Sequence, residues 1–167
     1  MTIAATPRLG LPLLAAGQAQ KEVVHNEALA LADLLVQPLA ESLGRNDPPS
    51  APVLGQIWIL GDAPTGAWAG HARAVAGWGE GGWRFIPAAE GLHLWLRDTG
   101  CRAVHRAGNW QQGVIEATEI RIGGLRVTGA RQAAIPMPSG GTTVDVQARD
   151  ALAAILAALR AHGLIST

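Results

Sequence analysis

The 167-residue sequence has one cysteine, no tyrosine, one phenylalanine and equal numbers of acidic and basic residues. The lone Cys101 excludes an internal disulfide framework, and a single thiol cannot by itself build a structural zinc site. Because the formal net charge is zero, the chain lacks the uniform positive field of a typical nucleic-acid-binding protein. We therefore expect no nucleic-acid partner.

Long hydrophobic runs are also missing. No segment is long enough to cross a bilayer, so we expect no membrane insertion. Residues 9–16 are similar to the core of a signal peptide, but Pro12 interrupts them and Arg8 alone supplies positive charge. This pattern argues against secretion through a signal peptide.

Familiar catalytic motifs are absent as well. The His-Asn-Glu run at residues 25–27 lacks the His-Glu-x-x-His spacing that places two metal ligands on one helical face, and there is no Gly-x-Ser-x-Gly elbow or P-loop. Glu80, Glu90 and Asp98 lie in or near turns, where acidic residues are common, so they do not indicate a glycosidase pair. The sequence predicts a protein that is not an enzyme and has no cofactor.

Glycine, proline and tryptophan are plentiful, with 21, 10 and 6 residues respectively. This composition favours a turn-rich β domain in the middle of the chain. Short apolar segments separated by glycine-rich turns predict a small antiparallel sheet or half-open barrel. The segments are residues 56–60, 71–76, 83–86, 92–97 and 101–106, with turns at 79–82 and 98–100, and a further hairpin around Gly123-Gly124.

Helices are expected at both ends. Leucines at 29, 31, 34 and 35 predict a helix that Asn26 caps and Pro38 ends. Residues 145–162 predict a second helix, capped by Thr142 or Asp145 and stopped by Gly163. Residues 43–52 and 134–141 have the composition of linkers.

The fold class is therefore predicted to be α+β. We expect an N-terminal docking arm and helix over residues 1–46 and a small Trp/Gly-rich antiparallel β domain over 47–133. A linker and a C-terminal amphipathic helix, used for oligomerisation, are expected over 134–167.

The turn at residues 98–100 suggests a polar cluster. A three-residue turn would pair Arg97 with Cys101 and His93 with His105, placing His93, Trp95, Cys101 and His105 on one face. Two imidazoles and a thiol are metal-ligand types, but a change of one residue in register separates them. We favour a half-exposed polar sheet face and expect no metal site.

The tryptophans allow two interpretations. Indole rings at strand ends could stack on sugar rings, and the candidates for such a glycan platform are Trp68, Trp78, Trp83 and Trp95. Alternatively, they supply the core or a subunit interface, which we favour because the domain has few other aromatic residues. Trp58 is expected in the core. Trp68, in a glycine-rich loop, is the best candidate for an exposed ring.

Two apolar surfaces are candidates for subunit contacts. Leu9, Leu11, Leu13 and Leu14 of the arm are too many to leave in water, so we expect them to bury against another subunit or the particle shell. In the C-terminal helix, Ala148, Leu152, Ile155 and Leu159 alternate steps of four and three, the spacing of a helix–helix seam. Packing on its own domain and a symmetric helix bundle are both open; a homo-oligomer is predicted.

Several motifs resemble one known family. They are LGLPLLAAGQAQKEVVHNEAL at residues 9–29, TGAWAGH at 65–71, GWRF at 82–85, EG at 90–91 and PSGGT at 138–142. The chain resembles an uncharacterised domain family of alphaproteobacterial prophages and gene transfer agents, whose members look like head-spike or receptor-binding components. Such proteins often carry a tryptophan where this chain has Leu92.

The resemblance implies a structural component of a phage-like particle. It would be the base of a gene transfer agent head spike, joining capsid vertex proteins to a distal host-binding fibre protein. A trimer, as in fibres, or a pentamer on a fivefold vertex is then expected. The protein would be made in the bacterial cytoplasm and released on the particle surface. The alternative is a glycan-binding adhesin module that contacts host capsular polysaccharide directly.

Overall fold

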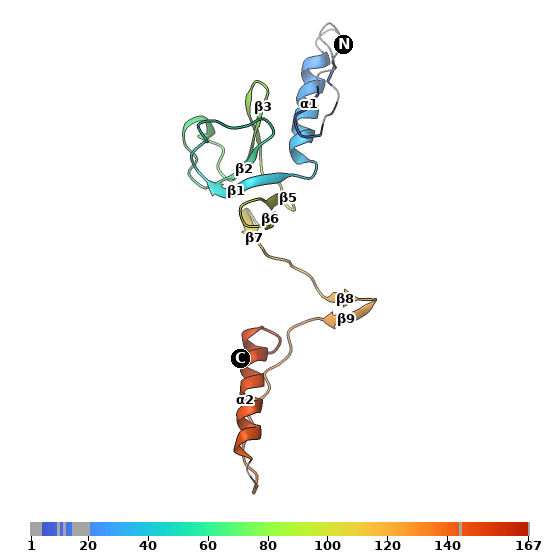
Figure 1. Ribbon diagram of the computed structural model, residues 1–167, viewed down its shortest axis with the longest axis vertical. Helices are drawn as coiled ribbons and strands as arrows, with labels where there is room; N and C mark the ends of the chain where they lie inside the picture. Colours follow the sequence, from blue (N-terminus) through green and yellow to red (C-terminus); the bar gives the residue numbers. More distant parts are fainter. Residues whose placement is uncertain (1–4, 10, 12, 15–20, 144, 167) are drawn as a thin grey trace. The chain divides into compact units, whose positions relative to one another are not determined.

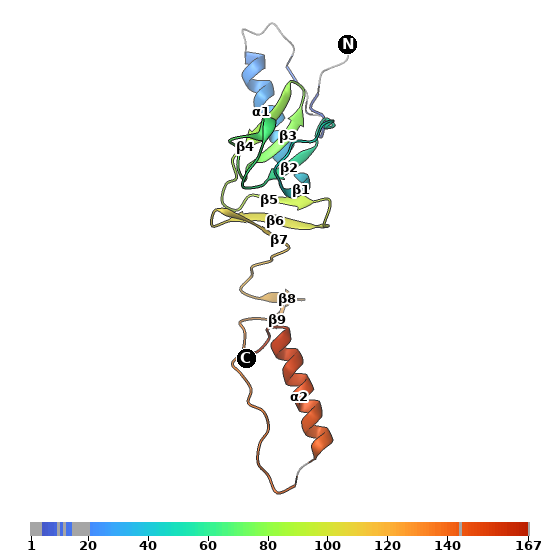
Figure 2. The same ribbon diagram turned by 90° about the vertical axis from the view of Figure 1, so that its left-hand side faces the viewer.

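The computed structural model describes residues 5–9, 11, 13–14, 21–143 and 145–166. The chain divides into two compact units, Met1–Val114 and Ile115–Thr167, which Figures 1 and 2 show in two orientations. The expected boundaries after residues 46 and 133 do not coincide with this division. The expected boundary after residue 46 lies inside unit 1, directly after a strand of the central sheet. The expected boundary after residue 133 lies inside unit 2, where it would separate a hairpin from a helix of the same unit.

Unit 1 contains a seven-stranded mixed sheet in the order β4-β3-β2-β1-β5-β6-β7. Strand β1 is parallel to both neighbours, β2 and β5, and every other pair is antiparallel. With one α-helix among the described residues of each unit, this mostly antiparallel sheet confirms the α+β class. The strands are β1 (Leu39–Arg45), β2 (Ile57–Leu60), β3 (Val75–Gly79), β4 (Gly82–Ile86), β5 (His93–Leu96), β6 (Cys101–Arg106) and β7 (Asn109–Gln112).

Residues 46–52 lack regular secondary structure, as expected of a linker, but residues 43–45 belong to the central strand β1, which was not predicted. Its Ala40 is fully buried and pairs with Ile57 on one side and Leu96 on the other. The sequence of β1, LAESLGR, does not alternate cleanly between apolar and polar residues, so it gives little strand signal. Register shifts also interrupt its pairing with β2. Strand β7 was also missed, while β2, β4, β5 and β6 confirm predicted segments.

Helix α1 (Lys21–Leu35) begins five residues before its expected cap. Asn26 therefore lies inside the helix, where its side-chain amide donates to Leu14 O at 3.0 Å and accepts from Leu14 N at 2.9 Å. The predicted end before Pro38 is confirmed. Leu34 packs on the sheet over Gly77, where an added Cβ would lie 2.5 Å from Leu34 Cδ2.

The described part of the arm docks on α1 of its own chain. The carboxylate of Asp33, which is 1% exposed, accepts from Thr6 Oγ1 at 2.8 Å, Arg8 N at 3.0 Å and Leu9 N at 2.6 Å. The Arg8 guanidinium donates to carbonyls at the end of α1, including Gln37 O at 2.7 Å. A cation there is favourable because the C-terminal end of a helix is partially negative.

Strand β2 is buried on both faces, which explains its uninterrupted apolar sequence, IWIL. Ile57 and Ile59 belong to the main core, whose other fully buried members come from β1, β3, β5 and β6. Trp58 and Leu60 point to the opposite face and join a second cluster that contains Trp68 and Ala76. The main core comprises Leu34, Ala40, Ile57, Ile59, Val75, Leu94, Leu96 and Ala103.

Unit 2 contains the hairpin β8 (Ile120–Ile122) and β9 (Leu125–Thr128) and helix α2 (Val146–Ala161). The sequence analysis predicted both the hairpin and helix α2. Gly123 and Gly124 have φ of +57° and +80°, which a tight hairpin turn requires. Asp145 caps α2 by accepting from Ala148 N at 2.9 Å. Among the described residues, no helix is long and apolar enough to cross a membrane.

Candidate functional site

The expected exposure of Trp68 is wrong, because its ring is completely buried. The loop forms a short 3-10 helix, η1 (Gly66–Trp68), and inserts the indole between Trp58 and Trp83, with ring centroids 6.0 and 5.1 Å away. Burying so large an apolar side chain is more favourable than displaying it. Trp58 is 3% exposed, which confirms its place in the core.

The other proposed glycan residues differ in exposure. Trp78 and Trp83 are half-buried and pack edge to face at 4.9 Å in the same cluster. Trp95 is 48% exposed on β5, where it pairs with Leu39 of β1 and Arg102 of β6. Among the four candidates, Trp95 alone presents a largely accessible ring.

The predicted register between β5 and β6 is wrong by one residue. Leu96 pairs with Cys101 across a four-residue turn, and His93 pairs with Val104 instead of His105. Cys101 and His105 consequently lie on the core side, whereas His93 and Trp95 lie on the other face. No group of three metal-ligand side chains occurs in the part of the chain that the structure describes.

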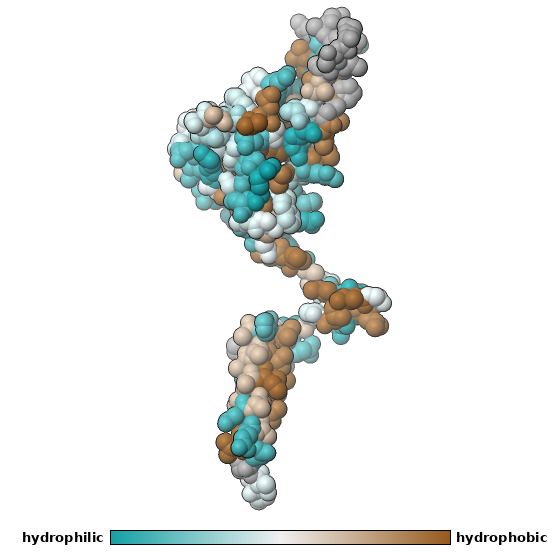
Figure 3. Space-filling view, in the orientation of Figure 1, coloured by the Kyte–Doolittle hydropathy of each residue, from teal (hydrophilic) through white to brown (hydrophobic). Residues whose placement is uncertain are grey.

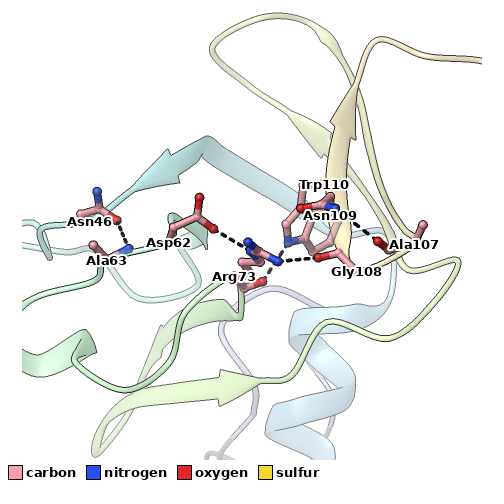
Figure 4. Close-up of polar contacts among 8 residues, drawn as sticks. All are labelled: Asn46, Asp62, Ala63, Arg73, Ala107, Gly108, Asn109 and Trp110. Carbon is pink, nitrogen blue, oxygen red and sulfur yellow. Dashed lines mark hydrogen bonds and ion pairs between the residues drawn. The ribbon is translucent and has the colours of Figure 1, made fainter.

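Arg73 joins two loops that are distant in the sequence (Figure 4). Its Nη1 donates to Gly108 O at 2.9 Å, and its carbonyl accepts from Trp110 Nε1 at 2.8 Å. Its Nε also donates to Asp62 at 2.6 Å. The sheet therefore curves enough to bring the β2–β3 loop against the β6–β7 turn, although three strands separate β2 from β7.

The loop after β2 is fixed from a second side. The Asn46 side chain accepts from Ala63 N at 3.2 Å, and Gly61 N donates to Arg45 O at 3.0 Å. The left-handed backbone of Arg73, with φ of +61°, is uncommon for a residue that carries a Cβ. The polar contacts of Arg73 hold this conformation in place.

A cavity of about 460 Å³ lies between these loops and the segment that follows β4. We call it the basic cavity, because its only ionisable lining residues are His71, Arg73 and His105. The His71 ring stacks on Phe85 with centroids 3.7 Å apart and planes 5° apart. The full lining is Gly70, His71, Ala72, Arg73, Ala74, Phe85, Pro87, Ala88, His105 and Gly108.

His105 is the most unusual residue of the basic cavity. It is 8% exposed and meets Trp110 edge to face at 5.2 Å. Its Nδ1 is buried and has no hydrogen-bond partner among the described residues. The sequence analysis placed His105 beside His93 and missed the cavity, because the lining comes from three stretches that are far apart in the sequence, within residues 70–74, 85–88 and 105–108.

Another cavity, of about 290 Å³, lies between the arm, α1 and the β3–β4 hairpin. Three of its four charged lining residues have partners: Arg84 Nη2 pairs with Glu27 Oε2 at 2.9 Å, and Asp33 binds the arm. Leu13 lines this cavity and Leu9 is 38% exposed, while Leu11, Leu13 and Leu14 are half-buried. Burial of these leucines against another subunit stays a prediction.

Unit 2 exposes an unusual amount of apolar surface. Ile120, Ile122, Leu125 and Val127 are 53–75% exposed. Ile122 and Leu125 pair directly and share one face of the hairpin, while a register shift interrupts the pairing next to Ile120. Figure 3 shows this hydrophobic cluster in brown over β8 and β9. Arg121 and Arg126 pair with each other on the opposite face.

Helix α2 presents a second apolar strip. Leu152 and Ile155 are about half exposed, Leu159 is half-buried and Leu156 is buried. The segment after β9 runs beside α2, since Gln132 bridges to Ile165 and Arg160 Nη2 donates to Ile135 O at 2.6 Å. Leu156 and Ile165 are the buried hydrophobic residues of the described part of unit 2.

A family model described as "Protein of unknown function (DUF2793)" matches residues 25–111, just over half of the chain. The match covers most of α1 and all seven strands up to the penultimate residue of β7. It ends before unit 2 begins. No curated protein matches the chain.

Proposed function

Because the chain belongs to the DUF2793 family, and because unit 2 exposes a large apolar surface, we propose that it is a structural component of a phage-like particle. In this proposal it forms the base of a gene transfer agent head spike and links the capsid to a distal host-binding fibre. The motifs at residues 9–29 and 65–71 support this particular assignment through their resemblance to head-spike proteins.

The apolar surface of unit 2 carries the proposal. An isolated two-stranded hairpin is marginally stable at best, and in the described part of unit 2 the buried hydrophobic residues are Leu156 and Ile165 alone. Ile120, Ile122, Leu125 and Val127 of the hairpin are each more than half exposed. Burying such side chains against a partner is favourable.

A second copy of the same unit is a suitable partner for this surface. Unit 2 contains five arginines and four acidic residues, so self-association brings little like-charge repulsion. The hairpin face and the α2 strip of Leu152, Ile155 and Leu159 would then bury in a symmetric assembly. We propose a trimer, as in fibres, or a pentamer on a fivefold capsid vertex.

Attachment to the particle is assigned to unit 1 and its arm. Leu9, Leu11, Leu13 and Leu14 would use their remaining exposed surface against capsid vertex proteins, while unit 2 would face the spike-fibre protein. The protein would thus lie on the surface of a virion-like particle and leave the cell with it. In this role it acts neither as an enzyme nor through a cofactor.

Sedimentation equilibrium of the full chain tests the assembly. We expect a trimer or pentamer for the wild type and a monomer for Ile122→Arg, because the new charge would be desolvated in the interface. Thr143→Arg adds the same charge at an exposed loop position of unit 2 and should leave the mass unchanged. A wild-type monomer at micromolar concentration, with the α2 circular dichroism signal intact, would contradict the proposal.

Trp95 supports a second candidate function, a glycan-binding module that contacts host capsular polysaccharide. Its exposed ring on a sheet face, opposite Arg102, is suited to stacking on a sugar. Trp95→Ala should abolish binding to immobilised polysaccharide while leaving assembly intact. Val53→Ala truncates another exposed apolar side chain and is the control. Unchanged binding by the Trp95 variant would exclude this function.

A further inference from the structure

We propose that the basic cavity of unit 1 is a binding site for a small carboxylate-bearing ligand, a single sugar acid such as a uronate. This site is separate from the self-assembly surface of unit 2, so neither proposal depends on the other. At about 460 Å³ the cavity is within the size range of small-molecule sites.

The charges of the cavity favour an anion. All of its ionisable lining residues, His71, Arg73 and His105, are basic, and no carboxylate lines it. Asp62 is the acidic partner of Arg73, but it contacts Nε and its side chain is 78% exposed to solvent. A carboxylate in the cavity would therefore meet hydrogen-bond donors without a competing acidic wall.

The imidazole of His105 provides a further observation. The ring lines the cavity, and its buried Nδ1 has no hydrogen-bond partner among the described residues. The fold itself therefore does not use this imidazole, which can donate to a ligand carboxylate from the edge that lines the cavity. His105 is held in place by Trp110 and by its backbone bonds to Leu92 and Gly91, so the site is pre-formed.

The apolar part of the lining suits the body of a sugar ring. His71 and Phe85 form a parallel stack, and Pro87 and Ala88 follow on the next segment of the wall. Carbon–hydrogen faces of a sugar pack on such surfaces, while its carboxylate bonds to the imidazoles. A neutral sugar would keep the packing of its ring on this surface but lose the carboxylate–imidazole hydrogen bonds.

Arg73 lines the cavity and has a strained backbone conformation. Its left-handed conformation costs free energy and persists because the Gly108, Trp110 and Asp62 contacts fix it. The contacts to Gly108 and Trp110 hold the β2–β3 loop against the β6–β7 turn at one side of the cavity. We regard Arg73 as a positioning residue and the two histidines as the ligand-binding groups.

Titration of the ¹⁵N-labelled full chain with sodium glucuronate tests the proposal by NMR. Glucuronate should shift the amide signals of Gly70, Ala88 and Gly108, whereas glucose at the same concentration should not. His71→Gln and His105→Gln should each weaken binding by about tenfold, the effect of losing one charge-assisted hydrogen bond. Higher salt should weaken it too.

His93→Gln is the matched control, since His93 is exposed on the other face of the sheet. It should bind glucuronate like the wild type. His71 is exposed, so its variant reports on binding even if the His105 variant does not fold. The proposal is overturned if millimolar glucuronate shifts no cavity signal, if glucose shifts them equally, or if the His71 and His93 variants bind alike.

Discussion

Gly77→Ala should loosen helix α1 from the sheet. The new Cβ would lie 2.5 Å from Leu34 Cδ2 and 3.0 Å from its Cγ, and Gly77 cannot retreat because it pairs with both Ile57 and Arg84. Overpacking of this kind costs about 1–3 kcal/mol. Replacing glycine in a strand otherwise gains about 0.5–1 kcal/mol, so the contact with Leu34 decides the sign.

The double variant isolates this contact. Leu34→Ala alone should cost about 2–5 kcal/mol, because it leaves a cavity beside the main core. In Gly77→Ala/Leu34→Ala the new methyl group enters that space. The loss of stability should therefore be smaller than the sum of the single losses by about 1–2 kcal/mol.

Urea unfolding followed by tryptophan fluorescence measures these differences, with far-UV circular dichroism to report the helix. Gly79→Ala is the control on the same strand, because its Cβ would meet the movable Arg84 guanidinium. We expect it to cost less than about 1 kcal/mol. Additive losses in the double variant would refute the packing of Leu34 on Gly77.

Other predictions concern the arm, the cysteine and α2. Asp33→Ala should lower the free energy of unfolding by about 2–4 kcal/mol, measured by thermal unfolding. Three hydrogen-bond donors of the arm would lose the carboxylate that accepts from them. Deleting residues 2–16 should likewise lower the melting temperature of unit 1, because buried Asp33 loses the arm; an unchanged temperature would show that the arm is dispensable for folding. Cys101→Ser should cost at most about 1 kcal/mol, and a chelator should leave melting unchanged. Asp145→Ala should reduce the helical signal of α2 on heating and cost about 1 kcal/mol, as loss of an N-cap does; an equal loss in Asp150→Ala would argue against the cap.

The two proposals have separable outcomes. Ile122→Arg changes a surface of unit 2 and should leave glucuronate binding unaltered, because the basic cavity lies wholly within unit 1. His71→Gln should conversely leave the sedimentation mass unaltered. A particle component that both self-assembles and binds acidic sugars would then use one unit for each task.

Several elements were predictable from the sequence because their signals are local. Helix α2 follows from its apolar spacing, the Asp145 cap and Gly163, and the β8–β9 hairpin follows from two glycines between short apolar runs. Strands β2, β4, β5 and β6 were predicted for the same reason. In these segments, interactions between residues a few positions apart are sufficient to choose the structure.

Tertiary structure alone decided the features that depend on distant partners. Strand β1 exists because β2 and β5 pair with it in parallel, and parallel pairing joins segments that the sequence does not place together. The register of β5 and β6 depends on one residue of turn length, which moved His105 to the core side. Trp68 is buried because Trp58 and Trp83 surround it. The basic cavity needs the curvature of the whole sheet, since Arg73 reaches Gly108 across three intervening strands.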